Sequence, residues 1–379
     1  MKPLTIEING TGTHNRGAEL MAIAIADRLR ATFPAVRLVV PSQFGSQADR
    51  EKHNFLTTWE FAGRAGAIRT MLASMAWRGR SDVINPAHVD IVLDASGFAF
   101  SDQWGASRPQ KLVRIMSRPY RRHQKLILLP QALGPFEKPD VADWSRKMFS
   151  RASLVFARDS HSHACASKLA PREVLRQFPD FTVSVSPTIP SDVSVPERFC
   201  AIVPNVRMMD KTSKGDDYLN FLRHAIDNME QTGMNPVIVL HDAEEDRTVL
   251  GLMGAKYSEL PILTHPDPRV LKGMLGKADF VIGSRFHALV SSLSQGVPCI
   301  GAGWSHKYPE LFRDFACPDL LLADLSDHSA LRSLIARLGN DDEREKISAR
   351  VSAAAIELKS RTDEMWGQVE DEIRAATQR

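Results

Sequence analysis

The chain has 379 residues, of which 43% are hydrophobic and 25% charged, a composition typical of a globular protein with room for two domains. No apolar run approaches the ~18 residues of a membrane span. The first residues lack the apolar core of a signal peptide. The four cysteines are widely separated and form no CxxC pair, so we expect a cytoplasmic protein with reduced thiols.

Basic residues are concentrated in the first half of the chain. Residues 1–190 carry a net charge of +10, and residues 191–379 carry −7. The interval between Asp102 and Glu137 contains no acidic residue, and its seven basic side chains predict a cationic helix face up to Pro119. They are Arg108, Lys111, Arg114, Arg118, Arg121, Arg122 and Lys125. Such a face suits an anionic partner; nucleic acid is not expected, because no recognised binding motif is present.

A second basic stretch covers residues 61–80. An apolar stripe at helical spacing (Ile68, Met71, Leu72 and Met75) is flanked by Arg64, Arg69, Arg78 and Arg80. One interpretation is an interfacial helix resting on acidic lipid, which would place the protein at the inner face of a membrane. The other is an ordinary amphipathic helix that packs its stripe on its own sheet.

Short apolar runs alternate with helical patterns along the chain, as in a doubly wound α/β protein. In the first half we expect strands at 4–9, 36–40, 91–95, 125–130 and 154–157, with helices at 17–32, 108–118, 141–151 and 160–168. The second half predicts strands at 199–204, 236–240, 279–282, 299–301 and near 320–322. A charged, periodic segment from residue 341 predicts a terminal helix or helix pair.

The alternation predicts two Rossmann-like domains that face a central cleft. The N-terminal domain covers residues 1–185 and the C-terminal domain residues 199–345. A stretch rich in Ser, Val and Pro gives a linker at 186–198, and a C-terminal helical segment covers 346–379.

The most informative motif lies at residues 278–288. A strand ends at Ile282, Gly283 makes a turn, and Ser284 is a suitable N-cap for a helix that Gly296 ends. The free amides of such a helix start attract phosphate or carboxylate, and Arg285 adds a planar fork that pairs with either. His287 adds a proton that moves near neutral pH. In the alternative interpretation, Arg285 and His287 only cap and solvate the helix start.

Further basic residues follow other strands of the same half. Lys307 comes after the strand at 299–301 and its loop, and Arg207 follows the strand at 199–204. Ligands bind at the carboxyl edge of open α/β sheets. We therefore expect Arg285, His287 and Lys307 to converge at one edge, with Arg207 as a further anion contact or a plain surface arginine.

The segment SRFHALVSSLSQGVPCIGAGWSHKYPELF, residues 284–312, resembles the polysaccharide pyruvyl transferase family. That family carries Arg-x-His at a helix start, then a small-residue helix, Gly-Val-Pro and a downstream Lys. Residues 15–20 resemble its Asn-x-Gly-Asp-Glu loop, although Ala18 stands where Asp is usual. Residues 129–135, 157–160 and 179–180 also resemble family blocks, so the resemblance spans about residues 5 to 312.

The resemblance implies a GT-B-like fold and transfer of the pyruvyl group of phosphoenolpyruvate to a sugar of a cell-surface polysaccharide or its lipid-linked precursor, forming a ketal. The donor's phosphate and carboxylate would be held by Ser284, Arg285, Lys307, Arg207 and Gly303. His287 is the candidate acid, and Asp94 or Glu19 the candidate base. Together with His287 and Asp94, Arg285 is also a candidate catalytic residue. Asn15, Arg16, Gly17 and Glu19 would hold the acceptor.

No metal or cofactor is demanded, because fixed cations can neutralise the developing phosphate. Asp94 could instead only cap the next segment. The main alternative function is a GT-B glycosyltransferase with a nucleotide-sugar donor, since a cationic sheet edge would serve a diphosphate equally well. A third is a catalytically silent scaffold protein of a polysaccharide assembly complex.

Overall fold

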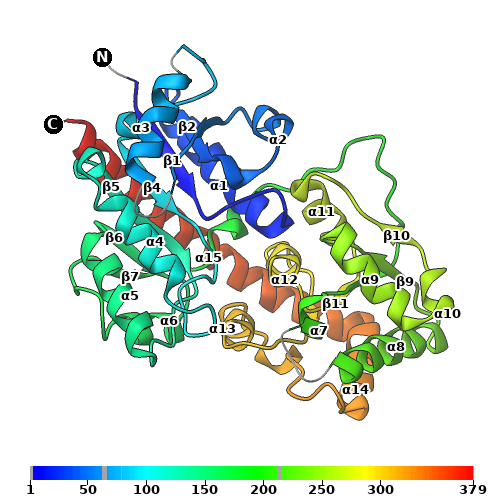
Figure 1. Ribbon diagram of the computed structural model, residues 1–379. Helices are drawn as coiled ribbons and strands as arrows, with labels where there is room; N and C mark the ends of the chain where they lie inside the picture. The colour runs from blue at the N-terminus through cyan, green and yellow to red at the C-terminus, as the bar shows by residue number, and fades with distance from the viewer. Residues whose placement is uncertain (1–2, 62–65, 78, 211–214, 379) are drawn as a thin grey trace. The chain divides into compact units, whose positions relative to one another are not determined.

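A computed structural model describes residues 3–61, 66–77, 79–210 and 215–378. The chain divides into two compact units, which we call unit 1 (Met1–Phe181 with Arg361–Arg379) and unit 2 (Thr182–Ser360). Each unit is built on its own parallel β-sheet (Figure 1). Residues 186–198, the predicted linker, lie in unit 2, where Val193 and Val195 pack against the core.

Unit 1 contains a seven-stranded sheet in the order β3-β2-β1-β4-β5-β6-β7, with all pairings parallel. Its strands are β1 (Thr5–Asn9), β2 (Arg37–Pro41), β3 (Leu56–Thr58), β4 (Ile91–Asp94), β5 (Lys125–Gln131), β6 (Leu154–Ala157) and β7 (Leu175–Gln177). The central strands are apolar and buried on both faces, which is why they read as continuous hydrophobic runs. The edge strands β3 and β7 are too short to give such a signal and were not predicted.

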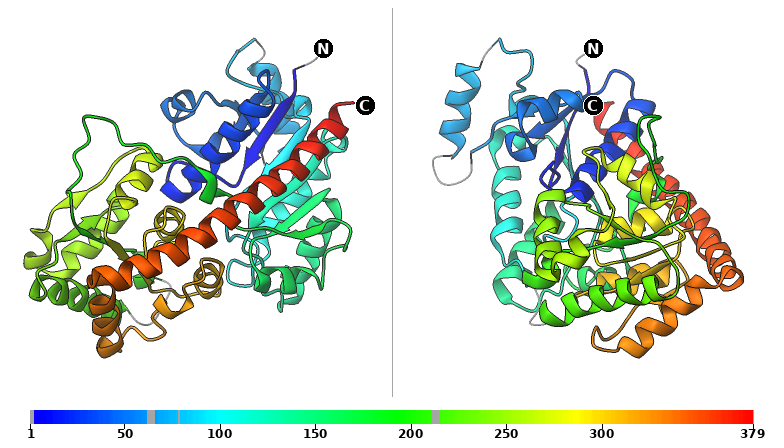
Figure 2. Two further views of the ribbon diagram at one scale, coloured as in Figure 1. Left: turned by 180° about the vertical axis from the view of Figure 1, so that it is seen from behind. Right: turned by 90° about the vertical axis from the view of Figure 1, so that its right-hand side faces the viewer.

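The helices of unit 1 cover both faces of this sheet. They are α1 (Arg16–Thr32), α2 (Gln47–Lys52), α3 (Gly66–Ala76), α4 (Ser107–Met116), α5 (Pro139–Arg151) and α6 (Ser160–Ala166). The right-hand view of Figure 2 places α4 and α5 on one face and α1 with the end of the C-terminal helix on the other. The predicted doubly wound arrangement is therefore confirmed for this unit.

Two arginines of the basic interval between Asp102 and Glu137 are buried instead of exposed. Arg121, in the short 3-10 turn η3 (Pro119–Arg121), has no exposed surface and pairs with Glu7 at 2.8 Å and with Glu60. Arg118 pairs with Glu60 at 2.7 Å and also donates to the Phe61 carbonyl. The prediction was wrong for these two residues because the acids that neutralise them lie some 60 or more positions away in sequence.

Helix α3 does not pack as an ordinary amphipathic helix, which was one of the two interpretations of its sequence. Ile68, Met71, Leu72 and Met75 are all more than half exposed, so the stripe does not pack on the sheet of its own unit. Arg64 and Arg78, which the sequence places beside the stripe, lie outside the described residues. Within the described ranges, no helix combines the length and apolarity that a membrane crossing needs.

Unit 2 contains a five-stranded parallel sheet in the order β10-β9-β8-β11-β12. Its strands are β8 (Cys200–Val203), β9 (Pro236–Val239), β10 (Ile262–Leu263), β11 (Phe280–Gly283) and β12 (Cys299–Gly301). Its helices are α7 (Arg207–Asp210), α8 (Gly215–Gln231), α9 (Ala243–Met253), α10 (Ala255–Ser258), α11 (Pro268–Leu275), α12 (Phe286–Leu293), α13 (Lys307–Asp314) and α14 (His328–Gly339). The strand expected near 320–322 is wrong: the 3-10 turn Pro318–Leu320 leaves only an isolated bridge from Leu321 to Gly301.

The C-terminal segment is one helix, α15 (Asp341–Thr377), whose residues are divided between the units after Ser360. Its first part buries Ile347, Val351, Ala355 and Leu358 in the core of unit 2. Its second part belongs to unit 1, where Trp366 meets Phe181 edge to face at 6.0 Å. Arg28 of α1 pairs there with Glu370 at 2.7 Å and Asp363 at 2.9 Å. The helix therefore completes both units.

Candidate functional site

In each sheet the strand order reverses beside the first strand, between β1 and β4 in unit 1 and between β8 and β11 in unit 2. Connections leave such a pair in opposite directions, which opens a crevice at the carboxyl ends of the two strands. An asparagine crosses each crevice. Asn9 donates to Asp94 at 2.9 Å in unit 1, and Asn205 donates to the Ser284 carbonyl at 2.7 Å in unit 2.

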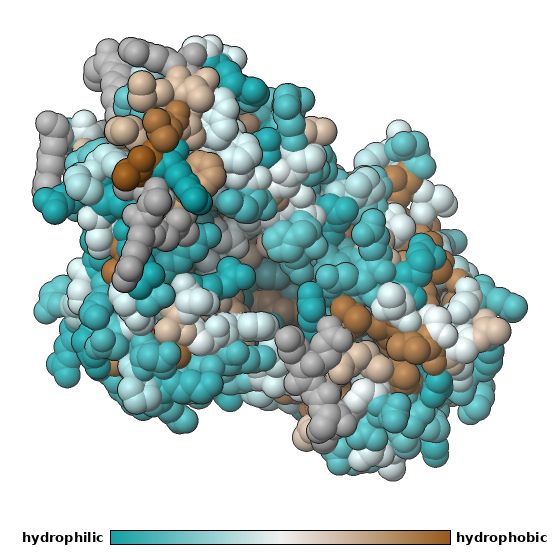
Figure 3. Space-filling view, viewed as in Figure 1, coloured by the Kyte–Doolittle hydropathy of each residue, from teal (hydrophilic) through white to brown (hydrophobic). Residues whose placement is uncertain are grey.

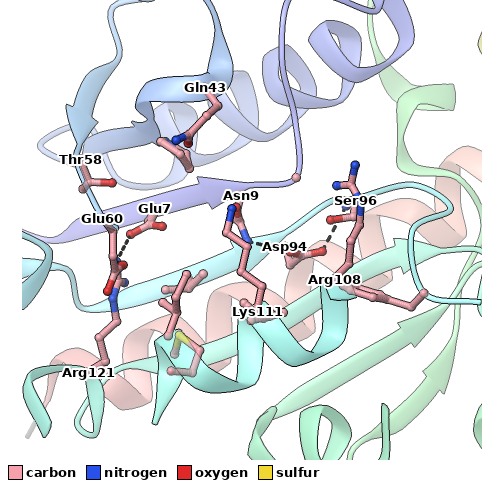
Figure 4. A pocket seen from close by; sticks show the side chains of 17 residues that line it. Glu7, Asn9, Gln43, Thr58, Glu60, Asp94, Ser96, Arg108, Lys111 and Arg121 are labelled. Carbon is pink, nitrogen blue, oxygen red and sulfur yellow. Dashed lines mark hydrogen bonds and ion pairs between the residues drawn. The ribbon is translucent and has the colours of Figure 1, made fainter. Parts of the chain in front are cut away.

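In unit 1 this crevice opens into a pocket, which we call the Asp94 pocket (Figure 4). The ends of β1 and β4 supply Asn9, Asp94 and Ser96, while Arg108 and Lys111 approach from α4. The exposed basic residues of α4 thus lie beside a buried carboxylate. The buried ion pairs of Arg121 with Glu7 and Glu60 form one end of the same pocket.

Asp94 is 1% exposed, and burial raises its pKa to about 6. Hydrogen bonds from Ser96 and Gln131 and the charge of Arg108 oppose this rise without cancelling it. The Ser96 amide donates to one carboxylate oxygen at 3.2 Å, and Asn9 donates to the other. A carboxyl group with this pKa can take up and release a proton near neutral pH, as a general base must.

The predicted acceptor-binding residues lie at the start of α1. Asn15 caps the helix by accepting from the Ala18 amide at 3.0 Å, and Gly17 is buried in the first turn. Glu19 is 1% exposed and pairs with Arg16 at 2.5 Å, His53 at 2.9 Å and Lys52 at 3.2 Å. Burial alone would raise the pKa of Glu19, but these partners lower it below its usual value. None of the predicted acceptor-binding residues is among the described residues that line the Asp94 pocket.

In unit 2 the turn between β11 and α12 is fixed through Ser284. Its carbonyl accepts from Asn205 and from the Tyr308 hydroxyl at 2.8 Å, and its side chain is hydrogen-bonded to the Tyr218 hydroxyl at 2.7 Å. Ser284 is therefore not the N-cap that the sequence predicts. The helix begins at Phe286 with Arg285 at the cap position and no side-chain cap, because the serine hydroxyl is held by Tyr218.

Arg285 is 6% exposed and is surrounded by carboxylates from the start of α9. It pairs with Asp242 at 2.6 Å, with Glu245 at 3.6 Å, and with Asp246 through two of its nitrogens. Burial raises the pKa of Asp246, and the adjacent guanidinium opposes that rise. Arg285 thus ties the β11–α12 turn to α9, while its predicted contact with the donor stays a prediction.

Arg207 lies close to this cluster, and its role as a further anion contact stays a prediction. It is half exposed and pairs with the other oxygen of Glu245 at 3.2 Å. One glutamate carboxylate therefore lies between Arg207 and Arg285. The sequence analysis did not identify the acidic partners Glu245 and Asp246, because α9 precedes β11 by some thirty residues and its acids resemble an ordinary first helical turn.

His287 and Lys307 accompany this turn. His287 is half-buried in the first turn of α12, with its ring edge-on to Phe286. The Lys307 ammonium lies 5.0 to 5.2 Å from the ring centres of Phe286, Trp304 and Tyr308, within cation–π range. At Gly303, any Cβ would stand 2.1 Å from the Tyr308 ring, so glycine there lets Tyr308 pack.

The fold is that of GT-B glycosyltransferases, and several solved structures share it over nearly the whole chain. HepE of Anabaena, in complex with UDP and glucose, is 13% identical, covers 98% of this chain and 100% of its own, and has a TM-score of 0.58. MnaA of S. aureus, solved with UDP, is 11% identical over 98% of this chain and 97% of its own, with a TM-score of 0.63. The spinosyn rhamnosyltransferase SpnG is 14% identical, covers 95% of this chain and 96% of its own, and has a TM-score of 0.53.

The sequence model of the polysaccharide pyruvyl transferase family matches residues 15–306, which include Asp94 and the start of α12. The chain therefore belongs to that family, and the resemblance noted in the sequence is confirmed. No curated protein matches the sequence significantly. The predicted fold class is also confirmed; the cleft between the two halves stays a prediction.

We predict that Arg285→Ala lowers the free energy of unfolding by about 3–5 kcal/mol, because Asp246 would remain buried without the guanidinium that pairs with it. Arg207→Ala is the matched control and should cost only about 0.2–1 kcal/mol, since its pair with Glu245 is exposed. Urea unfolding measures both. Adding Asp246→Asn to Arg285→Ala should recover part of the loss, and equal stability of the two single variants would contradict a structural role for Arg285.

For Asp94 we predict a distinctive dependence of stability on pH. Its pKa in the folded protein, about 6, exceeds the ordinary value of 3.8, so the folded state holds the proton more tightly. Stability should therefore fall by about 3 kcal/mol as pH rises between these values. Asp94→Asn should remove that slope, whereas Asp192→Asn, at an exposed aspartate, should keep it. Identical pH profiles of the wild type and Asp94→Asn in urea unfolding would refute the prediction.

Proposed function

We propose that the protein transfers the pyruvyl group of phosphoenolpyruvate to a sugar of a cell-surface polysaccharide or its lipid-linked precursor, forming a ketal. Membership of the polysaccharide pyruvyl transferase family supports this proposal. The observation that carries it is the start of α12, where Arg285, His287 and Lys307 accompany one strand end in unit 2. The proposal places the reaction in the cytoplasm and requires no metal or cofactor.

The donor carries a phosphate and a carboxylate, so its site must supply positive charge and hydrogen-bond donors. Lys307, His287 and the backbone amides of the first turn of α12 are the proposed contacts. Arg285 is already neutralised by acids, and a donor anion would have to replace one of them. Glu245 is the candidate, because it is 45% exposed and lies between Arg207 and Arg285. The donor's carboxylate in its place would carry the same charge as the glutamate.

Ketal formation adds one proton to the methylene carbon of phosphoenolpyruvate and joins two sugar oxygens to its central carbon. The two hydroxyl groups lose their protons, one proton goes to the methyl group, and the other leaves with inorganic phosphate. His287 is the proposed acid for the carbon. Asp94 is the proposed base, and its raised pKa favours it over Glu19, whose pKa is lowered.

The alternative is a nucleotide-sugar-dependent glycosyltransferase, which the fold also accommodates, since HepE and MnaA were solved with UDP. The identity of the donor distinguishes the pyruvyl transferase from the glycosyltransferase. We expect phosphoenolpyruvate, and not UDP-glucose, to raise the melting temperature and to release phosphate with a suitable saccharide acceptor. Release of UDP from a nucleotide sugar would favour the alternative. Partner binding without turnover of either donor would favour the scaffold.

We predict that His287→Gln lowers turnover by roughly 10²–10⁴, because glutamine can hydrogen-bond but cannot deliver a proton. Donor binding should change much less, so calorimetry with phosphoenolpyruvate and initial rates should diverge. His161→Gln, at an exposed histidine on α6, is the control and should match the wild type. Turnover of His287→Gln near the wild-type level would show that the acid lies elsewhere.

A further inference from the structure

The α3 face, formed by Ile68, Met71, Leu72 and Met75, is the largest group of exposed apolar side chains on neighbouring positions. These residues are 61%, 57%, 56% and 66% exposed, and they make up four of the eight large hydrophobic side chains that are exposed within the described ranges. Figure 3 shows brown apolar atoms gathered over α3. Contiguous exposed apolar surface of this kind marks an interaction site.

The rotation of α3 about its axis is fixed by contacts on its other side. Thr70 is 3% exposed and accepts from the Phe61 amide at 3.0 Å, and Gly66 lies so close to Phe61 that no Cβ would fit. Arg118 donates to the Phe61 carbonyl and pairs with Glu60. Polar and small residues thus hold the helix to unit 1, which directs the apolar residues outward.

The surroundings of the α3 face are basic. Residues 61–81 contain four arginines and no acidic residue. Arg69 is exposed on α3 itself, and Arg80 is half exposed after it, paired with Asp82 at 2.7 Å. Trp77 follows the helix with its ring centre 4.8 Å from that of Trp59, and both rings line a pocket behind Met71 and Met75. Apolar residues flanked by arginine and tryptophan are the pattern of a helix that lies in a lipid headgroup region.

We propose that the α3 face docks unit 1 on the surface of an anionic lipid bilayer. Charge complementarity favours lipid over a second copy of the chain, because a symmetric contact through α3 would place the exposed Arg69 of both copies in one interface, and residues 61–81 supply no acid to neutralise them. A bilayer takes up the apolar side chains and supplies the negative headgroups. The proposal is independent of which donor the enzyme uses.

Docking through α3 would also bring a membrane close to the proposed acceptor side of the reaction. The segment Thr58–Glu60 and the turn η3 separate the pocket behind α3 from the Asp94 pocket. Trp59 and Tyr120 line the former, while Glu60 and Arg121 line the latter. A membrane surface against α3 would therefore lie close to the carboxylate proposed to activate a sugar on a lipid-linked acceptor.

The test is co-sedimentation of the full chain with vesicles of phosphatidylcholine alone or mixed with phosphatidylglycerol. We expect binding to the mixed vesicles only, weakened by salt. Replacing both Leu72 and Met75 by Glu should reduce the partition coefficient roughly tenfold or more, and Arg69→Ala should reduce it about fivefold. Leu252→Glu and Ile356→Glu, which change equally exposed apolar residues in unit 2, are matched controls and should bind as the wild type does.

A second readout reports contact directly. Leu72→Cys, labelled with an environment-sensitive dye in a Cys165→Ser background, should shift its emission to the blue with mixed vesicles, and Ile356→Cys should not. Equal binding to both vesicle types, or equal losses in the α3 and control variants at unchanged melting temperature, would overturn the proposal. So would a dimer in solution that the Leu72 and Met75 substitutions dissociate, without any vesicle binding.

Discussion

Both units depend on a single geometric constraint, the reversal of strand order beside the first strand of each sheet. The crossover connections diverge at this point, and the carboxyl ends of the two strands border a crevice. An asparagine bridges the crevice in each unit. Asn9, at the end of β1, donates to Asp94 at the end of β4, and Asn205, just after β8, donates to the carbonyl of Ser284 just after β11. These two bonds fix the local geometry on which the candidate base and the start of α12 depend.

Packing then decides which charges are available for chemistry. Arg121 and Arg285 are cations of the kind that the sequence suggests for binding anions, yet both are enclosed by carboxylates of their own unit. Asp94, in contrast, forms no ion pair with any of the described residues, and burial raises its pKa. A charged residue type therefore gives little information about function until its partners are known, since a buried pair has already satisfied the charge.

The sequence predicted the parts of this protein that repeat or alternate along the chain. The central strands, the helix α1 and the terminal helix follow from apolar periodicity, which is local. Other features depend on distant residues. Ser284 could be expected to cap α12 until Tyr218, from another helix, was seen to hold its hydroxyl. The acids that enclose Arg285 come from α9, and the outward rotation of α3 is set by Phe61 and Arg118. None of these pairings can be recognised from the local spacing of residues in the sequence.

The division of α15 between the units bears on how the chain folds during synthesis. Unit 1 is built mostly from the first 181 residues, but its core also contains Trp366, Val369 and Ile373. While the ribosome extends the chain through unit 2, the first sheet has no helical segment to cover those positions. Unit 2 needs only residues 182–360 and is complete as soon as they emerge. The unit that is made first is thus finished last, and the apolar surface that α15 covers in the finished protein stays exposed until the last residues are made.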